Sequence, residues 1–395
     1  MPHCKMSLRP AWVEIDLAQL RENFRIIMND KPDHLEILSV VKDQAYGHGA
    51  VQVAKVALES GARYLAVATL DEALELRRNL PTAPILIFGE RPENQLRLCA
   101  EHDITCFVND PGTARYYDRL AAKLNKRPKV HVEIDTGLSR YGVRWSEALP
   151  VIEAVASCRN LLLEGVMSHF AMSDEEDKSY ALLQLERFTQ VLDRMRSKGI
   201  RVKYRHMCNT GGFLDLPQAH FDMVRIGILP LGVYPSQVCR RIPGLQPVMT
   251  VKARIAVVRQ LQTGDCVGYG MHYTAPAPRR IGVIPLGYAD GFPRVRNKGA
   301  VLIHGKRAPI IGGNAMDAMM VDITDIPEAK PWDEAVVMGR QGTEEISAHE
   351  IARLKGSVSY DILAGWRWRL PRHYLTSRRP DASKPTGFYQ EENNE

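Results

Sequence analysis

The segment "EILSVVKDQAYGHG" (residues 36–49) joins a short apolar run to a lysine and then to a glycine-rich turn. The run "EILSVV" (36–41) contains β-branched residues and has the length of a buried strand. Lys42 follows it directly, although lysine is among the side chains least often buried. A polar residue at the end of a buried strand is typical of parallel α/β folds, in which functional groups gather where the strands end.

Seven similar runs follow within the first 230 residues. They are "YLAVAT" (64–69), "PILIFG" (84–89), "ITCFV" (104–108), "KVHVEID" (129–135), "LEGVMSHF" (163–170), "KYRHMCN" (203–209) and "DMVRIGI" (222–228). Helix-like stretches separate most of them, which indicates parallel pairing through crossovers. Eight strands in about 210 residues predict a (β/α)8 barrel of the TIM type. An open doubly wound sheet is the alternative, and it is less favoured because no G-x-G-x-x-G follows the first strand.

The sequence changes character after residue 244. Helical periodicity nearly vanishes, and short strand-like pieces such as "VKARIAVVRQL" and "GAVLIHGKRAPIIGG" alternate with Gly and Pro. We therefore predict a barrel followed by a mostly antiparallel β domain. The expected division is a segment 1–11 that packs with the C-terminal domain, a barrel 12–244, a β domain 245–376 and a loosely ordered polar tail 377–395.

The composition excludes several classes of protein. The net charge is +6 over 395 residues and the Lys and Arg residues are dispersed, which disfavours nucleic acid and slightly favours an anionic small molecule. The seven cysteines contain no C-x-x-C spacing, so neither a zinc knuckle nor a disulfide framework is expected. No secretory signal and no apolar stretch of about 18 residues occur, so we expect a cytoplasmic protein without a membrane partner.

Polar residues end several of the predicted strands, which is where a barrel carries its catalytic groups. The candidates are Lys42 after the first strand, Asp135 and Arg140 after the fifth, His169 after the sixth, His206, Asn209 and Thr210 at the seventh, and Arg225, Gly227 and Ile228 at the eighth. The stretches "CNTGG" and "RIGI" combine a hydroxyl with glycines that let backbone N–H groups approach a phosphate. A desolvated lysine has a lowered pKa and becomes a nucleophile toward carbonyls. Together, a lysine, a phosphate site and an arginine indicate pyridoxal phosphate. The histidines have no spacing typical of a metal site.

The sequence resembles the alanine racemase family. "VVKDQAYGHG" resembles the family's pyridoxal-phosphate signature, and further blocks follow in the family's order and approximate spacing. These blocks are "VEIDTGLSRYG", "SHFAMSD", "HMCNTGGFLD", "VRIGI", "VGYGMHYTAP", "IPLGYADGFPR", "AMDAMMVDI" and "SYDILAGWRWRLPR". The resemblance extends over roughly residues 10–375 and implies an amino-acid racemase, with alanine as the expected substrate.

The resemblance implies two bases on opposite faces of the substrate Cα. Lys42 would bind the cofactor and act on one face, and Tyr269 in "VGYG" would act on the other, which is the arrangement that racemisation requires. A free tyrosine ionises near pH 10. The family therefore implies a supporting network in which His169 is linked to Arg225. Arg225 would also face the pyridine nitrogen, where a permanent positive charge discourages ring protonation and weakens the ring as an electron sink.

The resemblance also implies the remaining contacts. Phosphate contacts would come from Tyr46, Thr210, the backbone of Gly227 and Ile228, and Tyr360, with Asn209 beside them. Arg140 would contact the cofactor or the substrate carboxylate, Met316 would offer its backbone N–H to that carboxylate, and Asp317 and Tyr288 would lie near the entrance. In the family, Tyr269, Tyr288 and Met316 come from the partner subunit, which implies a head-to-tail homodimer.

Three departures from the family's usual pattern bear on specificity and orientation. Ala315 stands where cysteine is common, and the smaller side chain leaves a broader specificity open, for example toward serine or lysine. Glu133 stands where a lysine that can be carbamylated is common, so we expect its carboxylate to orient Arg140 directly. Asp43 and Gln44 also depart from the pattern, without an assigned consequence. Two alternatives remain at this stage: a pyridoxal-phosphate lyase or decarboxylase, which needs no opposed tyrosine, and a cofactor-binding protein, which needs no second domain.

Overall fold

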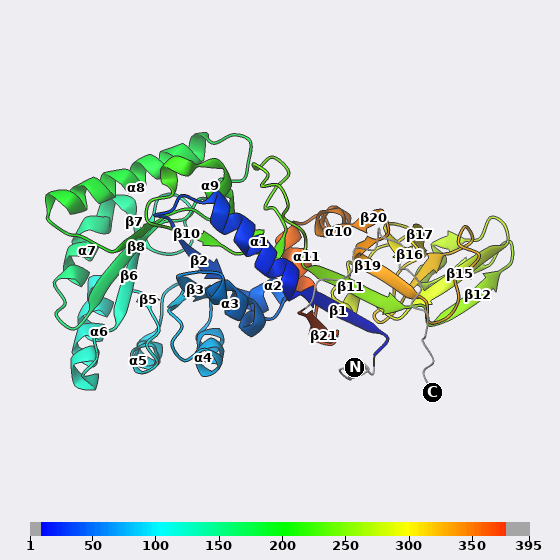
Figure 1. Ribbon diagram of the computed structural model, residues 1–395, viewed down its shortest axis with the longest axis horizontal. Helices are drawn as coiled ribbons and strands as arrows, with labels where there is room; N and C mark the ends of the chain where they lie inside the picture. The colour runs from blue at the N-terminus through cyan, green and yellow to red at the C-terminus, as the bar shows by residue number, and fades with distance from the viewer. Residues whose placement is uncertain (1–8, 377–395) are drawn as a thin grey trace, which may run out of the picture. The chain divides into compact units, whose positions relative to one another are not determined.

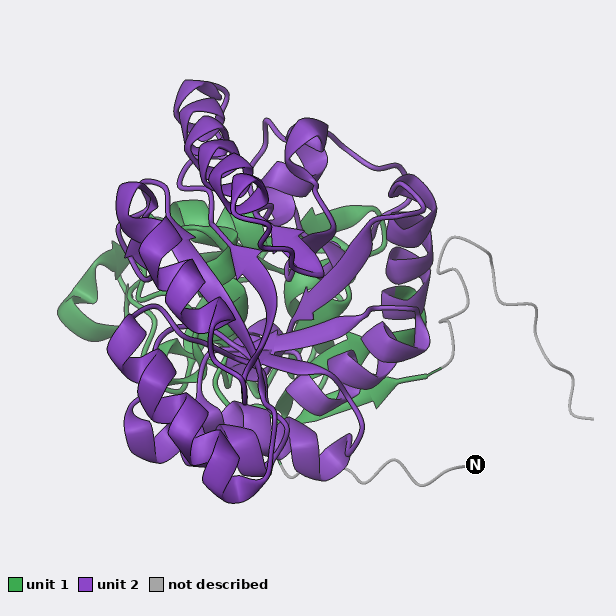
Figure 2. Ribbon diagram, turned by 90° about the vertical axis from the view of Figure 1, so that its left-hand side faces the viewer, with its two compact units in different colours: residues 1–19, 248–395 green, residues 20–247 purple. Residues whose placement is uncertain are grey.

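The computed structural model describes residues 9–376, so the predicted tail 377–395 and most of the predicted N-terminal segment lie outside the described residues. The chain divides into two compact units, residues 20–247 and residues 1–19 with 248–395 (Figure 2). The barrel unit therefore begins at residue 20 and not at residue 12. The reason is β1 (Ala11–Asp16), which pairs with β11 (Met249–Arg254) and not with the barrel strands.

Within residues 20–247 eight parallel strands form the predicted barrel. They are β2 (Glu36–Val40), β3 (Tyr64–Val67), β4 (Ile85–Ile87), β5 (Cys106–Phe107), β6 (Lys129–Asp135), β8 (Leu162–Met167), β9 (Tyr204–His206) and β10 (Met223–Ile226). The strand orders are β10-β2-β3-β4 and β5-β6-β8-β9. A bridge between Leu86 and Thr105 joins β4 to β5, and the Arg225 N–H donates to the Cys208 carbonyl (2.9 Å) where β10 meets β9. The eight predicted strands are thus confirmed, and β7 (Val143–Arg144) is a short addition beside β6.

Helices surround these strands, as the purple ribbon in Figure 2 shows. They are α1 (Leu17–Asp30), α3 (Ala50–Glu59), α4 (Leu70–Asn79), α5 (Glu93–Glu101), α6 (Pro111–Leu124), α7 (Ala148–Ala156) and α8 (Ser179–Ser197), with the short α2 (Lys42–Gly47) and α9 (Thr210–Asp215) and the 3-10 turns η1 (Trp145–Glu147), η2 (Pro217–Ala219) and η3 (Leu229–Leu231). The local sequence determines where several of these helices begin. The Asp110 side chain caps the N-terminus of α6, and Thr69 with Glu72 forms a capping box at the N-terminus of α4.

The second unit is a mostly antiparallel sheet in the order β12-β15-β18-β17-β16-β19-β11-β1-β21, and only the β1–β21 pair within the described residues of this sheet is parallel (Figure 1). Its further strands are β12 (Val257–Leu261), β13 (Cys266–Val267), β14 (Tyr273–Thr274), β15 (Arg279–Ile284), β16 (Ala300–Ile303), β17 (Lys306–Ile311), β18 (Met319–Asp322), β19 (Glu334–Gln341), β20 (Glu344–Ile346) and β21 (Arg372–Leu375). Between them lie α10 (Ala348–Lys355), α11 (Ser359–Gly365), η4 (Tyr269–Met271) and η5 (Tyr288–Asp290).

A two-residue turn shows how the local sequence builds this sheet. Ile303 pairs with Lys306, and the two residues between them, His304 and Gly305, both have positive φ (49° and 74°). Two-residue turns with this geometry match the twist of the strands that they connect. The predicted antiparallel β domain is therefore confirmed.

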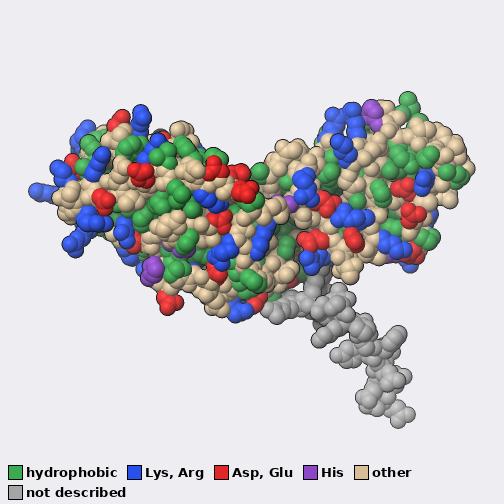
Figure 3. Space-filling model, turned by 90° about the horizontal axis from the view of Figure 1, so that it is seen from above, with side chains coloured by type: hydrophobic (Ala, Val, Ile, Leu, Met, Phe, Trp, Pro, Cys, Tyr) green, Lys and Arg blue, Asp and Glu red, His purple; other side chains and the backbone are tan. Residues whose placement is uncertain are grey.

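The surface carries charged side chains of both signs. Lys and Arg side chains are interspersed with Asp and Glu on the face shown in Figure 3. Among residues 9–376, no helix is long and apolar enough to cross a membrane.

Candidate active site at the ends of the barrel strands

The turn after Lys42 has an unusual backbone. Residues 43–46 all lie in the left-handed helical region, with φ between 51° and 54°, although none of them is glycine. Each L-residue in this region costs roughly 1–2 kcal/mol, so a turn of four such residues costs on the order of 4–8 kcal/mol. Contacts from elsewhere in the barrel must therefore hold it.

Side chains of helix α4 supply two of these contacts. The Asp43 N–H donates to the Glu72 carboxylate at 2.6 Å, and the Gln44 side-chain amide donates to Glu75 at 2.9 Å. The Gln44 side-chain oxygen also accepts from the Ala50 N–H (3.1 Å), at the first residue of α3. Gln44 thus anchors the turn on both sides, and Asp43 contributes through its backbone. This assigns a structural role to the two departures that the sequence left without one.

Lys42 lies at the end of β2, at the start of this turn. Burial lowers the pKa of Lys42, and the positive charge of Arg140 lowers it further, while Glu72 and Asp43 act in the opposite direction. The amine is therefore easier to deprotonate than an ordinary lysine, which is what a nucleophile or a base requires.

Tyr46 is buried at the other end of the turn, and burial raises the pKa of its phenol. It packs against Gly227, where an added Cβ would overlap the Tyr46 hydroxyl. Only glycine therefore fits at position 227. The turn after β2 and the segment after β10 meet at this contact, which brings Lys42, Tyr46 and Gly227 into one site.

Arg225 on β10 is the buried centre of a hydrogen-bonded chain. Its guanidinium donates to Nδ1 of His169 (2.9 Å) and Nδ1 of His206 (3.1 Å), and also to the carbonyls of Ser168 and Met207 (2.8 Å each). Since the guanidinium can only donate, both histidines must accept at Nδ1 and are therefore neutral. Burial and the neighbouring Arg225 hold the pKa of each histidine well below its usual range, and burial lowers the pKa of Arg225 to about 10.

The chain continues away from Arg225 through the barrel interior. His206 Nε2 lies 2.9 Å from His131 Nδ1, His131 Nε2 lies 3.5 Å from the Glu164 carboxylate, and the Tyr64 hydroxyl donates to Glu164 at 2.5 Å. Because Nδ1 of His206 accepts from Arg225, the proton of His206 is on Nε2, and this Nε2 donates to Nδ1 of His131. The proton of His131 is therefore on its own Nε2. The hydrogen-bonded chain ends at His131, whose Nε2 has no hydrogen-bond partner among the described residues, although the Glu164 carboxylate lies 3.5 Å away.

Glu133 on β6 is buried, and burial raises its pKa to about 7, while Arg225 and Arg140 act in the opposite direction. Its backbone N–H donates to the Asn109 side chain at 2.8 Å, which fixes the strand end. At neutral pH Glu133 therefore carries only part of the negative charge that we expected to orient Arg140. Its role in orienting Arg140 stays a prediction, and this role should strengthen as the pH rises.

Asn209 and Thr210 lie where β9 passes into α9. The Asn209 side chain caps α9 by accepting from the Gly212 N–H (3.0 Å), and it also accepts from the Ser173 hydroxyl (2.7 Å). Thr210 is buried at the first position of the helix, and Ile228 follows Gly227 directly after β10. The barrel unit thus gathers the predicted residues of the loops after β2, β6, β8, β9 and β10.

The other predicted residues belong to the β unit. They are Tyr269 in η4, Tyr288 in η5, Met316 and Asp317 between β17 and β18, and Tyr360 in α11. The Tyr288 N–H donates to the Ala315 carbonyl (3.2 Å), so the η5 turn is paired with the segment that carries Met316. Tyr269 is 77% exposed and Met316 is 52% exposed. Both side chains are therefore accessible in the single chain.

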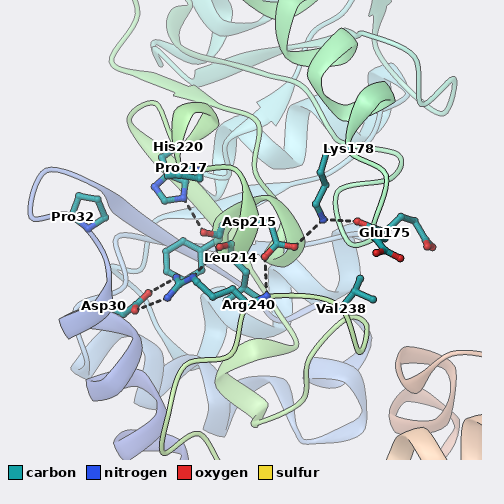
Figure 4. A pocket seen from close by; sticks show the side chains of 12 residues that line it. Asp30, Pro32, Glu175, Lys178, Leu214, Asp215, Pro217, His220, Val238 and Arg240 are labelled. Atoms are coloured by element: carbon teal, nitrogen blue, oxygen red, sulfur yellow. Dashed lines mark hydrogen bonds and ion pairs between the residues drawn. The ribbon is translucent and has the colours of Figure 1, made fainter.

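A separate cavity of about 870 Å³ lies elsewhere in the barrel unit (Figure 4). Two ion pairs line it, since Lys178 contacts Asp215 at 2.8 Å and Arg240 contacts Asp30 at 2.7 Å. None of the predicted site residues lines it. In the described residues, no group of three or more His, Cys, Asp or Glu side chains is placed to hold a metal ion.

The sequence reasoning missed three residues of the network around the site. Glu72 had a signal, because Thr69 and Glu72 have the spacing of a capping box, but the spacing does not reveal its bond to Asp43. Glu164 also had a signal, since it is an acid within an otherwise apolar strand. His131 had none, because its partner His206 is 75 positions away.

A parallel barrel with an amine of lowered pKa at the end of one strand and a buried arginine on the neighbouring strand is typical of a class of enzyme that acts on carbonyl compounds. Two family models match the chain: "Alanine racemase, N-terminal domain" over residues 15–235 and "Alanine racemase, C-terminal domain" over residues 248–374. The chain belongs to the alanine racemase family.

Individual relatives cover nearly the whole chain. An alanine racemase from Carboxydothermus hydrogenoformans is 42% identical over 93% of this chain and 100% of its own, and one from Methanococcus maripaludis is 37% identical over 94% and 100%. Among solved structures, alanine racemase from Clostridium difficile 630 has a TM-score of 0.89 at 33% identity, covering 95% of this chain and 98% of its own. Alanine racemase from Bacillus anthracis with bound L-Ala-P has a TM-score of 0.87 at 36% identity, covering 93% and 96%.

Proposed function

We propose that the protein is a pyridoxal-phosphate-dependent alanine racemase, an isomerase that interconverts L- and D-alanine. The observation that carries this function is Lys42, an amine of lowered pKa held at the end of β2 by a rigid turn. Membership of the alanine racemase family and relatives named alanine racemase over more than nine-tenths of the chain support the substrate. The absence of a membrane-spanning helix among residues 9–376 is compatible with a cytoplasmic location, which we propose on the same grounds.

The barrel residues fit the cofactor in two respects. The Nε of Arg225 is buried and has no hydrogen-bond partner among the described residues, so it is a donor suited to an acceptor such as a pyridine nitrogen. Gly227 carries no side chain between its backbone and the Tyr46 hydroxyl, where a Cβ would overlap that oxygen, and this close approach lets the two groups contact one phosphate. The residues that would hold the cofactor are Lys42, Tyr46, His169, Asn209, Thr210, Arg225, Gly227, Ile228 and Tyr360.

When bound, pyridoxal phosphate supplies an aldehyde that captures the amino group and a ring that withdraws electrons from Cα. Lys42 removes or returns the α-proton on one face, for which its lowered pKa makes the neutral amine available. Tyr269 acts on the opposite face. Arg225 stays positively charged while His169 and His206 stay neutral, and its guanidinium would provide a cation for the ring nitrogen.

The substrate carboxylate is bound by Arg140 and by the Met316 backbone, with Asp317 and Tyr288 near the entrance. We further propose a head-to-tail homodimer in which a second copy supplies Tyr269, Tyr288 and Met316. The exposure of Tyr269 (77%) and Met316 (52%) supports this arrangement, because side chains that complete a partner's site must be accessible before association.

One observation favours a broader specificity as the second candidate. Ala315 has a small side chain directly before Met316, and the Ala315 carbonyl accepts from the Tyr288 N–H. A small side chain next to Met316 would accommodate a substrate side chain larger than that of alanine, such as serine or lysine.

The test is to incubate the purified holoenzyme with a panel of L-amino acids and follow the loss of optical rotation. The proposed function predicts complete racemisation of alanine, with serine and lysine slower. A Lys42→Arg variant serves as the control and should be inactive. No loss of rotation with any amino acid would overturn the racemase assignment, and a faster reaction with serine or lysine would replace alanine as the substrate.

A further inference from the structure

We propose that Glu72 is a positioning residue for Lys42, because its carboxylate holds the left-handed turn that presents the lysine amine. This inference rests on the proposed function of Lys42. Glu72 lies on α4, thirty positions after the lysine. Its effect on the lysine passes through the backbone of Asp43, the residue that immediately follows Lys42.

The geometry gives the two carboxylate oxygens different tasks. One oxygen accepts from the Asp43 N–H at 2.6 Å. The other accepts from the N–H groups of Ala68 (2.9 Å) and Thr69 (3.0 Å), directly after β3. One side chain therefore ties the segment after β3 to the segment after β2, which is the neighbouring strand. An ionised carboxylate suits this position, because it accepts on both oxygens and donates on neither.

The capping of α4 does not require the bond between the Glu72 carboxylate and the Asp43 N–H. A capping box needs the Glu side chain to accept from the N-cap N–H and the Thr69 hydroxyl to accept from the Glu72 N–H, and both bonds are present. The bond to Asp43 is additional, and it connects Glu72 to a residue outside α4. The same residue thus combines a local role in α4 with a long-range role at the lysine, and the two roles are separable by substitution.

The turn has a second anchor, which makes Asp43 the position that Glu72 controls. Gln44 is held by Glu75 and by the Ala50 N–H, so the far part of the turn stays in place without Glu72. Asp43 has φ 51°, a conformation that an L-residue leaves unless a contact retains it. Release of its N–H lets the backbone next to Lys42 relax toward the right-handed region, which redirects the lysine side chain.

A purely electrostatic role of Glu72 predicts a different result from a positioning role. The negative charge of Glu72 raises the pKa of Lys42, against the effect of burial and of Arg140. If Glu72 acted only through its charge, its loss would move the limb of the pH profile that depends on Lys42 toward lower pH and leave the turn unchanged. If it acts by positioning, the turn itself loosens.

The test uses the holoenzyme and four variants, which are Glu72→Gln, Asp71→Asn, Thr69→Ala and Glu72→Asp. Glu72→Gln keeps the size but offers one acceptor oxygen, so its amide N–H₂ faces an N–H donor on one side. Asp71→Asn removes the same charge from the same turn of α4, at an exposed side chain. Thr69→Ala removes the hydroxyl of the capping box without touching Asp43. Each is measured by hydrogen exchange of peptides covering residues 42–49, by the rate of cofactor loss, and by kcat and KM.

Positioning predicts that Glu72→Gln speeds exchange of this segment by at least about tenfold, since a local opening is no longer opposed. It also predicts faster cofactor loss and a kcat lowered by roughly 10–100-fold with KM nearly unchanged. Asp71→Asn and Thr69→Ala should leave the exchange of residues 42–49 within about twofold of the wild type. Glu72→Asp, with the charge kept and the reach shortened, should be intermediate, and it replaces Glu72→Gln if that variant does not fold.

Three results would overturn the inference. The first is a hydrogen-exchange rate of residues 42–49 in Glu72→Gln equal to that of the wild type. The second is faster exchange of this segment in Thr69→Ala, to the same extent as in Glu72→Gln. The third is a pH profile of Glu72→Gln that shifts while the exchange of the turn stays unchanged. Failure of the proposed function looks different: the wild type would not racemise alanine, while Glu72→Gln would still loosen the turn and release the cofactor faster than Asp71→Asn does.

Discussion

Replacing Glu133 with glutamine should change how the stability of the barrel depends on pH. Burial raises the pKa of Glu133 from its usual 4.5 to about 7, which corresponds to a free-energy difference of about 3 kcal/mol between its two protonation states. The folded protein binds this proton more tightly than the unfolded chain. The stabilising contribution of the protonated form is therefore fully present below about pH 4.5 and is lost as the pH rises to about 7.

A glutamine at this position cannot ionise. The free energy of unfolding of Glu133→Gln should therefore rise relative to that of the wild type by up to about 3 kcal/mol between pH 4.5 and pH 8. The measurement is urea unfolding followed by circular dichroism, at a series of pH values, on protein freed of cofactor so that ligand binding does not contribute. Glu147→Gln, an exposed acid of the same unit, is the matched control and should run parallel to the wild type.

The same ionisation should appear in substrate binding. The Glu133 carboxylate forms as the pH rises through about 7, and we expect its negative charge to orient Arg140. The KM for alanine should therefore fall over this range in the wild type and stay flat in Glu133→Gln. Identical pH profiles of stability and of KM in the two proteins would refute both the raised pKa and the role of Glu133 in orienting Arg140.

Three further substitutions test other parts of the site. Gly227→Ala places a Cβ against the Tyr46 hydroxyl, so it should cost about 1–3 kcal/mol of stability and weaken cofactor binding, as measured by thermal unfolding and by equilibrium dialysis. Glu164→Leu removes the carboxylate that accepts from the Tyr64 hydroxyl and leaves it only the longer contact with Thr105, so unfolding in urea should show a loss of about 1–3 kcal/mol, and an unchanged midpoint would contradict the network. Tyr269→Phe keeps the ring but removes the acid–base group, so the initial rate from L-alanine should fall by at least about a hundredfold while far-ultraviolet circular dichroism stays the same.

The barrel could be predicted because its strands are short, β-branched and separated by helical stretches. All eight predicted runs contain a strand, and the differences are at the ends, as in "ITCFV", where only Cys106–Phe107 is assigned to β5. The segment "AWVEID" was harder to place. Its buried and less buried residues alternate, which is typical of a sheet with one covered face, but its partner β11 begins more than 230 positions later. Local sequence does not specify such a pairing.

The placement of three candidate residues at strand ends could be predicted for a similar reason. Lys42, His169 and Arg225 end strands of a parallel barrel, so the fold brings them together once the strands are known. The left-handed turn could not be predicted, because residues 43–46 have no local preference for positive φ. Contacts with Glu72 and Glu75 on a later helix impose that conformation. The chain from Arg225 through His206 to His131 is likewise built from residues on separate strands.

We propose that Lys42 and Tyr269 act on opposite faces of Cα, and racemisation of L-alanine in D₂O tests this directly. At early times, two bases predict that the D-alanine formed carries deuterium at Cα, because the incoming proton comes from a group that exchanges with solvent. Lys42→Ala and Tyr269→Phe should each abolish this conversion. D-Alanine that retains the proton of the substrate, formed at an unchanged rate in Tyr269→Phe, would contradict the account.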